Sequence, residues 1–223
     1  MFRLIVFASL LALLGACATA PINLGELKVQ LNGYHASGAY ERDLAAADRE
    51  AAAWVAANAA RASRPALVLD IDETSLSNWP QMAANDFGYI PGGACDALPA
   101  GPCGSVAWEL SARSTVIGPT LALFNAAKAA GVAIFFITGR PEDERDATAK
   151  NLRAAGYEGW AGLTLKPATL HVASAADYKA AERAKIEAQG YTIIANVGDQ
   201  PSDLAGGHAA RGFLLPNPFY RIP

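Results

Sequence analysis

The sequence has few of the residues that build zinc or redox centres, with only three histidines and three cysteines among its 223 residues. His35, His171 and His208 are spread along the chain without the spacing of a zinc site. There is no strongly basic segment and the formal net charge is −3, which excludes the usual electrostatic footprint of a nucleic-acid-binding protein. With 17% charged and 52% hydrophobic residues, the chain is neither a polytopic membrane protein nor disordered. Its length fits one domain with a small insertion.

The longest apolar run lies at the N-terminus and is too short to cross a bilayer, which takes roughly 20 residues. Leu4–Ala16 is uncharged, follows Arg3 and ends in Leu14-Gly15-Ala16-Cys17, which is similar to a bacterial lipobox. We therefore expect residues 1–16 to be a signal peptide, Cys17 to carry lipid, and residues 17–223 to form a single domain anchored to the cell envelope. Ala18 is not the aspartate that retains lipoproteins in the inner membrane, which favours the outer membrane, facing the periplasm or the exterior. The alternative is an ordinary secretory signal and a soluble periplasmic or secreted protein.

The other two cysteines form an even pair once Cys17 is assigned to lipid. Cys95 and Cys103 flank the turn-forming dipeptide Gly101-Pro102, and an exported protein matures where disulfides persist. A bridge here would stabilise the fold by about 2–3 kcal/mol. Two free thiols are the alternative, and a metal role is the weakest reading because no histidine lies nearby.

The rest of the chain alternates between predicted helices and strands. This order predicts an α/β fold with a doubly wound parallel sheet, preceded by N-terminal helices. Residues 75–117 lack periodicity and are rich in proline and glycine, so we expect an irregular insertion that caps a site. The predicted helices are residues 22–62 (in two pieces broken at Ser37-Gly38), 121–130, 142–155 and 175–189; the predicted strands are residues 66–69, 132–137, 163–165, 191–197 and 212–215.

Polar residues suited to phosphate chemistry follow the predicted strands, where ligands bind in doubly wound sheets. Asp70-Ile71-Asp72-Glu73-Thr74 comes after the first strand, so that one carboxylate can attack while the second moves protons. Thr138-Gly139-Arg140, expected in the turn after the second strand, can offer a hydroxyl and backbone N–H groups to a phosphate. Gly198-Asp199 with Asp203, after the fourth strand, offers oxygen ligands for Mg²⁺.

A lysine is the remaining member of such a set, and the chain offers two candidates. Lys179 lies in a predicted helix, whereas Lys166 comes just after the third strand. Either could place a positive charge between a nucleophile and a phosphate oxygen. Taken singly, each of these motifs also has an ordinary explanation as a turn, a cap or a solvated helix face.

Taken together and in this order, the motifs resemble the haloacid dehalogenase superfamily of phosphohydrolases. The resemblance is closest to the branch that contains lipoprotein-type class C bacterial acid phosphatases, plant acid phosphatases and vegetative storage proteins. It extends over most of residues 30–223. The segments that carry it are Leu67–Thr74, Tyr178-Lys179 with Arg183, Gly190-Tyr191 through Gly198–Leu204, and Leu215–Tyr220.

The resemblance implies a Mg²⁺-dependent phosphomonoester hydrolase. Asp70 would be the nucleophile that forms an aspartyl-phosphate, and Asp72 the general acid and base. Mg²⁺ would be held by an Asp70 oxygen, the Asp72 carbonyl and Asp199. Phosphate oxygens would be held by Thr138, Gly139 and Lys179; Asp203 would hold a metal-bound water or orient Lys179, with Arg183 in support.

Substrate choice would come from the insertion, which carries four aromatic residues suited to stacking on a nucleotide base or an aryl group. They are Trp79, Phe87, Tyr89 and Trp108. Core packing explains each of them singly, and we expect no more than one to line the pocket. The rival hypotheses are a non-catalytic binding or storage protein on the same fold and a structural envelope lipoprotein.

The lipobox makes a direct prediction about Cys17. Expressed in a bacterium that processes lipoproteins, the full chain should gain the mass of a lipid at Cys17 and partition into the detergent phase, whereas Cys17→Ala should not. Mass spectrometry of the N-terminal peptide, with and without globomycin, measures this. An unmodified mature N-terminus beginning after Ala18 or Ala20 would instead show plain secretion.

Overall fold

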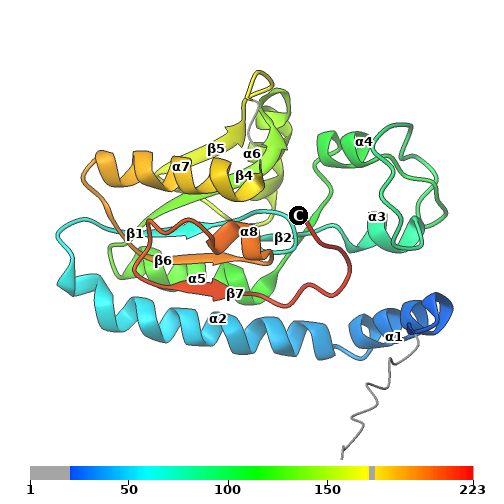
Figure 1. Ribbon diagram of the computed structural model, residues 1–223, viewed down its shortest axis with the longest axis horizontal. Coiled ribbons are helices and arrows are strands. Elements are labelled where there is room, and N and C mark those ends of the chain that lie inside the picture. The colour runs from blue at the N-terminus through cyan, green and yellow to red at the C-terminus, as the bar shows by residue number, and fades with distance from the viewer. Residues whose placement is uncertain (1–20, 171–173, 223) are drawn as a thin grey trace, which may run out of the picture.

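The computed structural model describes residues 21–170 and 174–222, and its centre is a five-stranded parallel sheet (Figure 1). The strands run in the order β5-β4-β1-β6-β7, so the chain starts in the middle and adds strands to both sides. The crevice beyond the carboxyl end of β1 is therefore the topological switch point, where ligands bind in open α/β sheets. The strands are β1 (Pro65–Leu69), β4 (Ala133–Pro141), β5 (Gly162–Lys166), β6 (Thr192–Gly198) and β7 (Gly212–Leu214).

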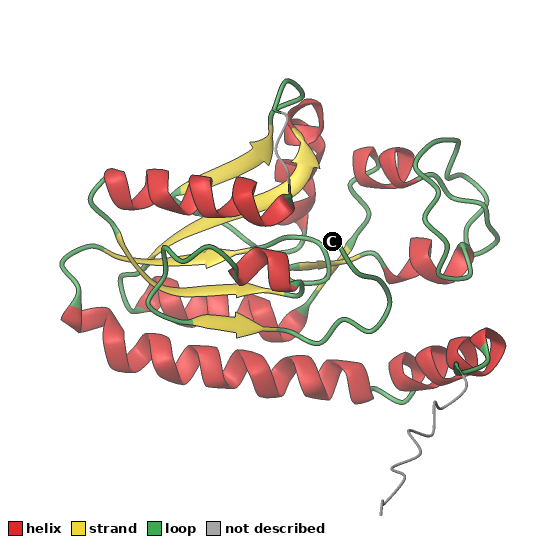
Figure 2. Cartoon of the chain, in the orientation of Figure 1, coloured by secondary structure: helices red, strands yellow, loops and turns green. Residues whose placement is uncertain are grey.

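Helices cover both faces of this sheet, which is why its strands are almost continuously apolar. Leu67 and Leu69 of β1 face a large core with α2 (Ala39–Asn58), α5 (Gly118–Ala129) and α6 (Arg145–Ala154). Ala66 and Val68 point to the opposite face, where α7 (Ala175–Ala188) packs. Figure 2 shows the sheet held between these helical layers. The predicted doubly wound α/β fold is confirmed.

The insertion between β1 and α5 is more ordered than the sequence predicts. It contains β2 (Leu76–Ser77) paired antiparallel with β3 (Thr115–Val116), and the short helices α3 (Trp79–Ala84) and α4 (Ser105–Leu110). Elements this short carry too few apolar positions for a period to show in the sequence. They stand beyond the carboxyl ends of the strands, at the right of Figure 1. Cys95 and Cys103 form the predicted disulfide between α3 and α4.

The remaining elements follow the prediction with small differences at their ends. The N-terminal helical region breaks at Ser37-Gly38 as expected, because Gly38 adopts a left-handed φ of +70° between α1 (Leu24–Ala36) and α2. The helix predicted from residue 142 opens with a 3₁₀ turn, η2 (Glu142–Glu144), and a second 3₁₀ turn, η1 (Ala59–Arg61), follows α2. The last helix, α8 (Pro201–Leu204), is a single turn.

The predicted signal peptide and lipobox lie outside the described residues. Among residues 21–170 and 174–222, none of the helices combines the length and the apolar character that a membrane span requires.

One buried carboxylate joins the helices α2 and α5 on one face of the sheet. Asp48 of α2 is only 3% exposed, and its Oδ2 accepts a hydrogen bond of 2.9 Å from the Thr120 hydroxyl of α5. Its Oδ1 has no hydrogen-bond partner among the described residues. Burial raises the pKa of Asp48 to about 6, although the Thr120 hydrogen bond acts in the opposite direction.

This raised pKa predicts a pH-dependent stability. The folded protein holds the Asp48 proton more tightly than the unfolded chain does, so the Asp48 contribution to the free energy of unfolding falls as the pH rises from about 4 to above 6. Asp48→Asn removes that loss. The free energy of unfolding of the variant, relative to that of the parent, should therefore be about 2–3 kcal/mol higher at pH ~7.5 than at pH ~4. Urea unfolding at both pH values measures the gain. The exposed Asp96→Asn serves as the control, and an equal gain in both variants would contradict the assignment.

Candidate active site

A lysine bridges two carboxylates at the carboxyl end of the central strand. Asp70 directly follows β1, and its Oδ1 lies 2.5 Å from Lys179 Nζ of α7. The same Nζ is 2.5 Å from Oδ1 of Asp203 in α8. All three side chains are buried, so the ion pairs are largely shielded from solvent screening. Burial alone would lower the pKa of Lys179, but the charges of Asp70 and Asp203 raise it above its usual value.

A third carboxylate, Asp199, follows β6 and is held by a set of side-chain donors. Its Oδ1 accepts a hydrogen bond of 3.2 Å from the Thr74 hydroxyl, and its Oδ2 accepts bonds of 2.6 Å from Gln200 and 2.7 Å from Asn217. Gly198 is required beside it, because a Cβ at that position would lie 2.4 Å from Asp203. The sequence therefore brings β6 and α8 into close contact at this point.

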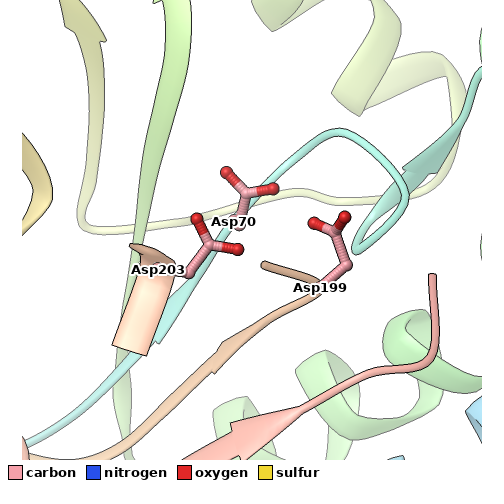
Figure 3. Close-up of side chains that lie close together, drawn as sticks. All are labelled: Asp70, Asp199 and Asp203. Carbon is pink, nitrogen blue, oxygen red and sulfur yellow. The ribbon is translucent and has the colours of Figure 1, made fainter. Parts of the chain in front are cut away.

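Asp70, Asp199 and Asp203 form a cluster suited to a hard cation (Figure 3). Each offers an oxygen within 4.8 Å of the others, and all three side chains are buried. Burial raises the pKa of Asp70, with Lys179 opposing it and the neighbouring aspartates adding to it, and burial with the Asp203 charge raises the pKa of Asp199 to about 6. This excess of buried negative charge and the all-oxygen donor set fit a divalent ion such as Mg²⁺.

Asp72 is held in a separate group of contacts on the cap side. Its carboxylate accepts hydrogen bonds of 2.6 and 3.1 Å from the buried Arg140 guanidinium, and its Oδ1 accepts one of 2.8 Å from the Asn78 amide. Burial acts to raise the pKa of Asp72, but Arg140 and Asn78 together lower it below its usual value. Asp72 is therefore charged and fixed in orientation in the resting protein.

Glu73 lies at the turn between the two groups and is fully buried. It adopts a left-handed φ of +52°, a strained conformation for a non-glycine residue and one that concentrates at functional sites. Its carboxylate accepts hydrogen bonds from the Asn78 backbone N–H at 2.6 Å and from the Tyr220 hydroxyl at 2.9 Å. Burial raises the pKa of Glu73 to about 8.

The predicted phosphate-binding turn lies within a strand, which corrects the sequence interpretation. β4 continues to Pro141, which pairs with Lys166 after an irregularity in register that begins at Ile137. Thr138, Gly139 and Arg140 therefore occupy the end of the strand and not a strand-to-helix turn. Thr138 is fully buried, Gly139 is exposed, and the Thr138 hydroxyl accepts a hydrogen bond from the Arg140 N–H at 3.1 Å.

Arg183 supports the site through backbone contacts. Its guanidinium donates hydrogen bonds to the carbonyls of Asp203, Ala205 and Gly207, which fixes the end of α8 against α7. It lies one helical turn after Lys179, so one face of α7 supplies both residues.

The carboxylates open into a cavity of about 870 Å³ between the sheet and the insertion. Phe87, Tyr89 and Trp108 contribute to its wall, so the expectation that at most one aromatic residue lines it is wrong. Phe87 also packs against the main core, so one side chain of the insertion can contact both the core and the cavity. Trp79, in contrast, stacks on His35 at 3.6 Å and belongs to the core. Lys166 also lines the cavity, but no hydrogen bond or ion pair joins it to the carboxylates among the described residues.

Several residues of this site receive no role in the sequence-based prediction. Those that lie in the motifs quoted there are Glu73, Arg140, Asn217, Phe219 and Tyr220, and those outside the motifs are Asn78, Glu109, Arg221 and Ile222. Phe219–Ile222 come from the C-terminal segment, which has no periodicity. Glu73 and Asn78 had a weak signal, since both lie within nine residues of Asp70 in the sequence.

Comparison with protein families gives one match over nearly the whole chain. The model described as "HAD superfamily, subfamily IIIB (Acid phosphatase)" matches residues 16–223. Two curated plant proteins are similar in sequence: "Acid phosphatase 1" of Solanum lycopersicum, 33% identical over 71% of this chain and 60% of the relative, and "Stem 28 kDa glycoprotein" of Glycine max, 36% identical over 70% and 59%. The aligned part of this chain thus spans about three fifths of these relatives.

A solved structure has the same fold. The class C acid phosphatase from Bacillus anthracis with tungstate bound superposes with a TM-score of 0.69, covering 88% of this chain and 86% of that one. The two are 20% identical, so this likeness concerns the fold alone.

The geometry predicts different roles for the two candidate lysines. Lys179→Met should lower kcat/KM for 4-nitrophenyl phosphate by about 100-fold or more, since it removes the cation beside Asp70. Lys166→Met should retain activity within a few fold. Steady-state kinetics on both purified variants, with circular dichroism to verify folding, measures this. Loss of turnover in Lys166→Met alone would reverse the assignment.

Proposed function

Because this chain belongs to subfamily IIIB of the HAD superfamily, the acid phosphatases, we propose that it hydrolyses phosphomonoesters through a phosphorylated Asp70. The observation that carries the proposal is the pairing of Asp70 with Lys179 at the carboxyl end of β1, with Asp72 two residues later on the cap side of the same turn. A buried carboxylate in contact with a cation can approach a phosphate whose negative charge would otherwise repel it.

In the first step an Asp70 oxygen attacks the phosphorus, and the bond from phosphorus to the ester oxygen breaks. Asp72 gives a proton to the leaving alcohol oxygen. Asp72 is ionised in the resting protein, so it takes up this proton as substrate binds; the phosphate's own negative charge raises the pKa of a nearby carboxyl. Lys179, the Thr138 hydroxyl and the Gly139 N–H would hold the non-bridging phosphate oxygens.

In the second step a water molecule attacks the phosphorus of the aspartyl-phosphate. Asp72, now ionised, accepts the water proton, the bond from Asp70 to phosphorus breaks, and inorganic phosphate leaves with the carboxylate regenerated. Arg140 holds the Asp72 carboxylate in the charged form that this step needs.

We propose Mg²⁺ as the cofactor, held by an Asp70 oxygen, the Asp72 carbonyl and Asp199. Bound there, it would neutralise charge on the transferring phosphate. Asp203, which already contacts Lys179, would orient that lysine. The hydrogen bonds from Thr74, Gln200 and Asn217 support this set, since they fix the Asp199 carboxylate in place.

The cavity supports a substrate with a flat, apolar leaving group, such as an aryl phosphate or a nucleotide. Its wall includes Met82, Phe87 and Tyr89, with Tyr89 80% exposed to solvent. Aromatic faces of this kind stack on planar groups.

The lipobox supports an envelope location, with the domain attached to a membrane through lipid on Cys17. The soluble or secreted form remains the alternative to this anchor.

Other relatives include "Vegetative storage protein 1" of Arabidopsis thaliana, 32% identical over 70% of this chain. A storage role without catalysis is disfavoured here, because Asp70, Asp72 and Lys179 are all present and line the same cavity.

The nucleophile assignment is tested by Asp70→Asn. We expect the variant and the EDTA-treated parent protein to lose hydrolysis of 4-nitrophenyl phosphate, with Mg²⁺ restoring the parent but not the variant. Mass spectrometry of acid-quenched parent protein should show phosphate on Asp70. The matched control is Asp96→Asn, which should keep full activity. Full activity in Asp70→Asn would overturn the mechanism, and an inactive, well-folded parent would favour the storage role.

A further inference from the structure

We propose that Asn78 is a positioning residue that makes the protonating function of Asp72 depend on the cap. The proposal rests on the proposed function, in which Asp72 is the general acid and base. Asn78 is buried at the start of the insertion, directly before α3. It contacts Asp72 on one side and the cap helix α4 on the other.

The Asn78 side chain uses all of its hydrogen-bonding capacity in this position. Its Nδ2 donates to Asp72 Oδ1 at 2.8 Å and to Glu73 Oε2 at 3.2 Å. Its Oδ1 accepts from Trp108 Nε1 at 2.8 Å and from the Ser114 hydroxyl at 2.8 Å. An amide offers two donors and an oxygen with two lone pairs, so no capacity is left over.

The chemistry of Trp108 fixes which way this amide points. An indole N–H can only donate, so the Asn78 oxygen must face Trp108 and the NH₂ group must face the carboxylates. If Trp108 moved away, the carboxylates of Asp72 and Glu73 would still attract the NH₂ group, but the amide would lose a donor that holds its oxygen in place and could shift relative to Asp72. The orientation of Asp72 is thereby tied to the position of α4.

Trp108 is itself held by the part of the cap that the disulfide closes. It packs with Cys95 and Cys103, and the Arg113 guanidinium lies 5.3 Å from its ring. Arg113 also donates to the Cys95 carbonyl at 2.9 Å. A chain of direct contacts therefore runs from the disulfide loop through Trp108 and Asn78 to Asp72.

Arg140 contacts the same carboxylate but does not make the orientation of Asp72 depend on the cap. It comes from β4 in the sheet, so it supplies charge to Asp72 whatever the cap does. Its contact with the cap is a looser one, 3.9 Å to Glu109 of α4. Asn78 is thus the group that joins Asp72 to the cap by direct hydrogen bonds.

The test compares two substrates that differ in their need for a proton. An alkyl phosphate must have its leaving oxygen protonated, whereas 4-nitrophenolate leaves without help, and kcat/KM reports the steps up to that departure. We expect the double variant Trp108→Phe/Ser114→Ala, which keeps Asn78 but removes both donors to its oxygen, to lose about 10-fold or more in kcat/KM for the alkyl phosphate. Because Trp108 also lines the cavity, the measure is the ratio of the two kcat/KM values, and the loss for 4-nitrophenyl phosphate should be at least threefold smaller than the loss for the alkyl phosphate. Ser114→Ala alone, at a residue outside the cavity lining, should show the same selective loss to a smaller degree.

Asn78→Ala should show the same selective loss to a larger degree. The matched control is Trp54→Phe, which removes an indole hydrogen bond of equal length to the Ile194 carbonyl, away from the cavity. That variant should keep both activities. Thermal unfolding of each variant shows whether it is folded, and the double variant decides the matter if Asn78→Ala is not.

The reference is Asp72→Asn, which separates this inference from the proposed function. If Asp72→Asn lacks the selective loss for the alkyl phosphate, the acid role of Asp72 fails. If Asp72→Asn shows the selective loss and the folded double variant shows none, or loses both substrates equally, the positioning role of Asn78 is wrong.

Discussion

The site depends on one buried ion pair network, in which Lys179 lies between Asp70 and Asp203. Two carboxylates this close repel each other, and burial adds a desolvation cost that raises the pKa of Asp70. Lys179 opposes both effects, but the pKa of Asp70 stays raised because burial and the neighbouring aspartates outweigh it. Asp199 adds a third carboxylate to the cluster. The network is thus stable enough to fold and still negative enough to attract a divalent ion. The carboxyl group of the proposed nucleophile, Asp70, is thereby oriented by Lys179 and shielded from bulk water.

The parallel sheet is what brings these groups together, and this much could be predicted from the sequence. Short apolar runs predict the strands, and polar residues follow each run. Because strands that alternate with helices are parallel, these polar residues all lie at the same edge of the sheet. Asp70, Asp199 and Asp203 could be assigned to that edge without coordinates. The choice of Lys179 over Lys166 was harder to predict, since strand order alone places Lys166 equally near. It is decided by α7, which packs with Tyr178 in the core beneath β1 and directs the next residue at Asp70.

The contacts that orient the site were less accessible to sequence reasoning, for two physical reasons. Arg140 was expected in a turn, and only the irregular pairing of β4 with β5 shows that the strand continues and directs its guanidinium at Asp72. Asn78, Glu73 and Tyr220 act through hydrogen bonds between segments distant in the chain or in a strained turn, as in the contact from Tyr220 to Glu73. Such bonds depend on side-chain direction, which neither periodicity nor composition encodes. The prediction for the cap aromatics is wrong for a related reason. An aromatic residue in a short insertion can pack against the core or line the cavity, and the sequence pattern does not distinguish these two positions.

Both segments that close the cavity also hold a carboxylate of the site. The C-terminal segment reaches Asp199 through Asn217 and Glu73 through Tyr220, while the insertion reaches Asp72 through Asn78. The carboxylates of Asp70 and Asp203 are held instead by Lys179 of α7, which packs on the sheet. In the proposed mechanism, attack by Asp70 would therefore rely on the helix and sheet core, whereas proton transfer by Asp72 and cation binding by Asp199 would rely on segments that also line the cavity. A fold arranged in this way can alter its leaving-group preference by changing the cap while the phosphoryl-transfer centre stays the same.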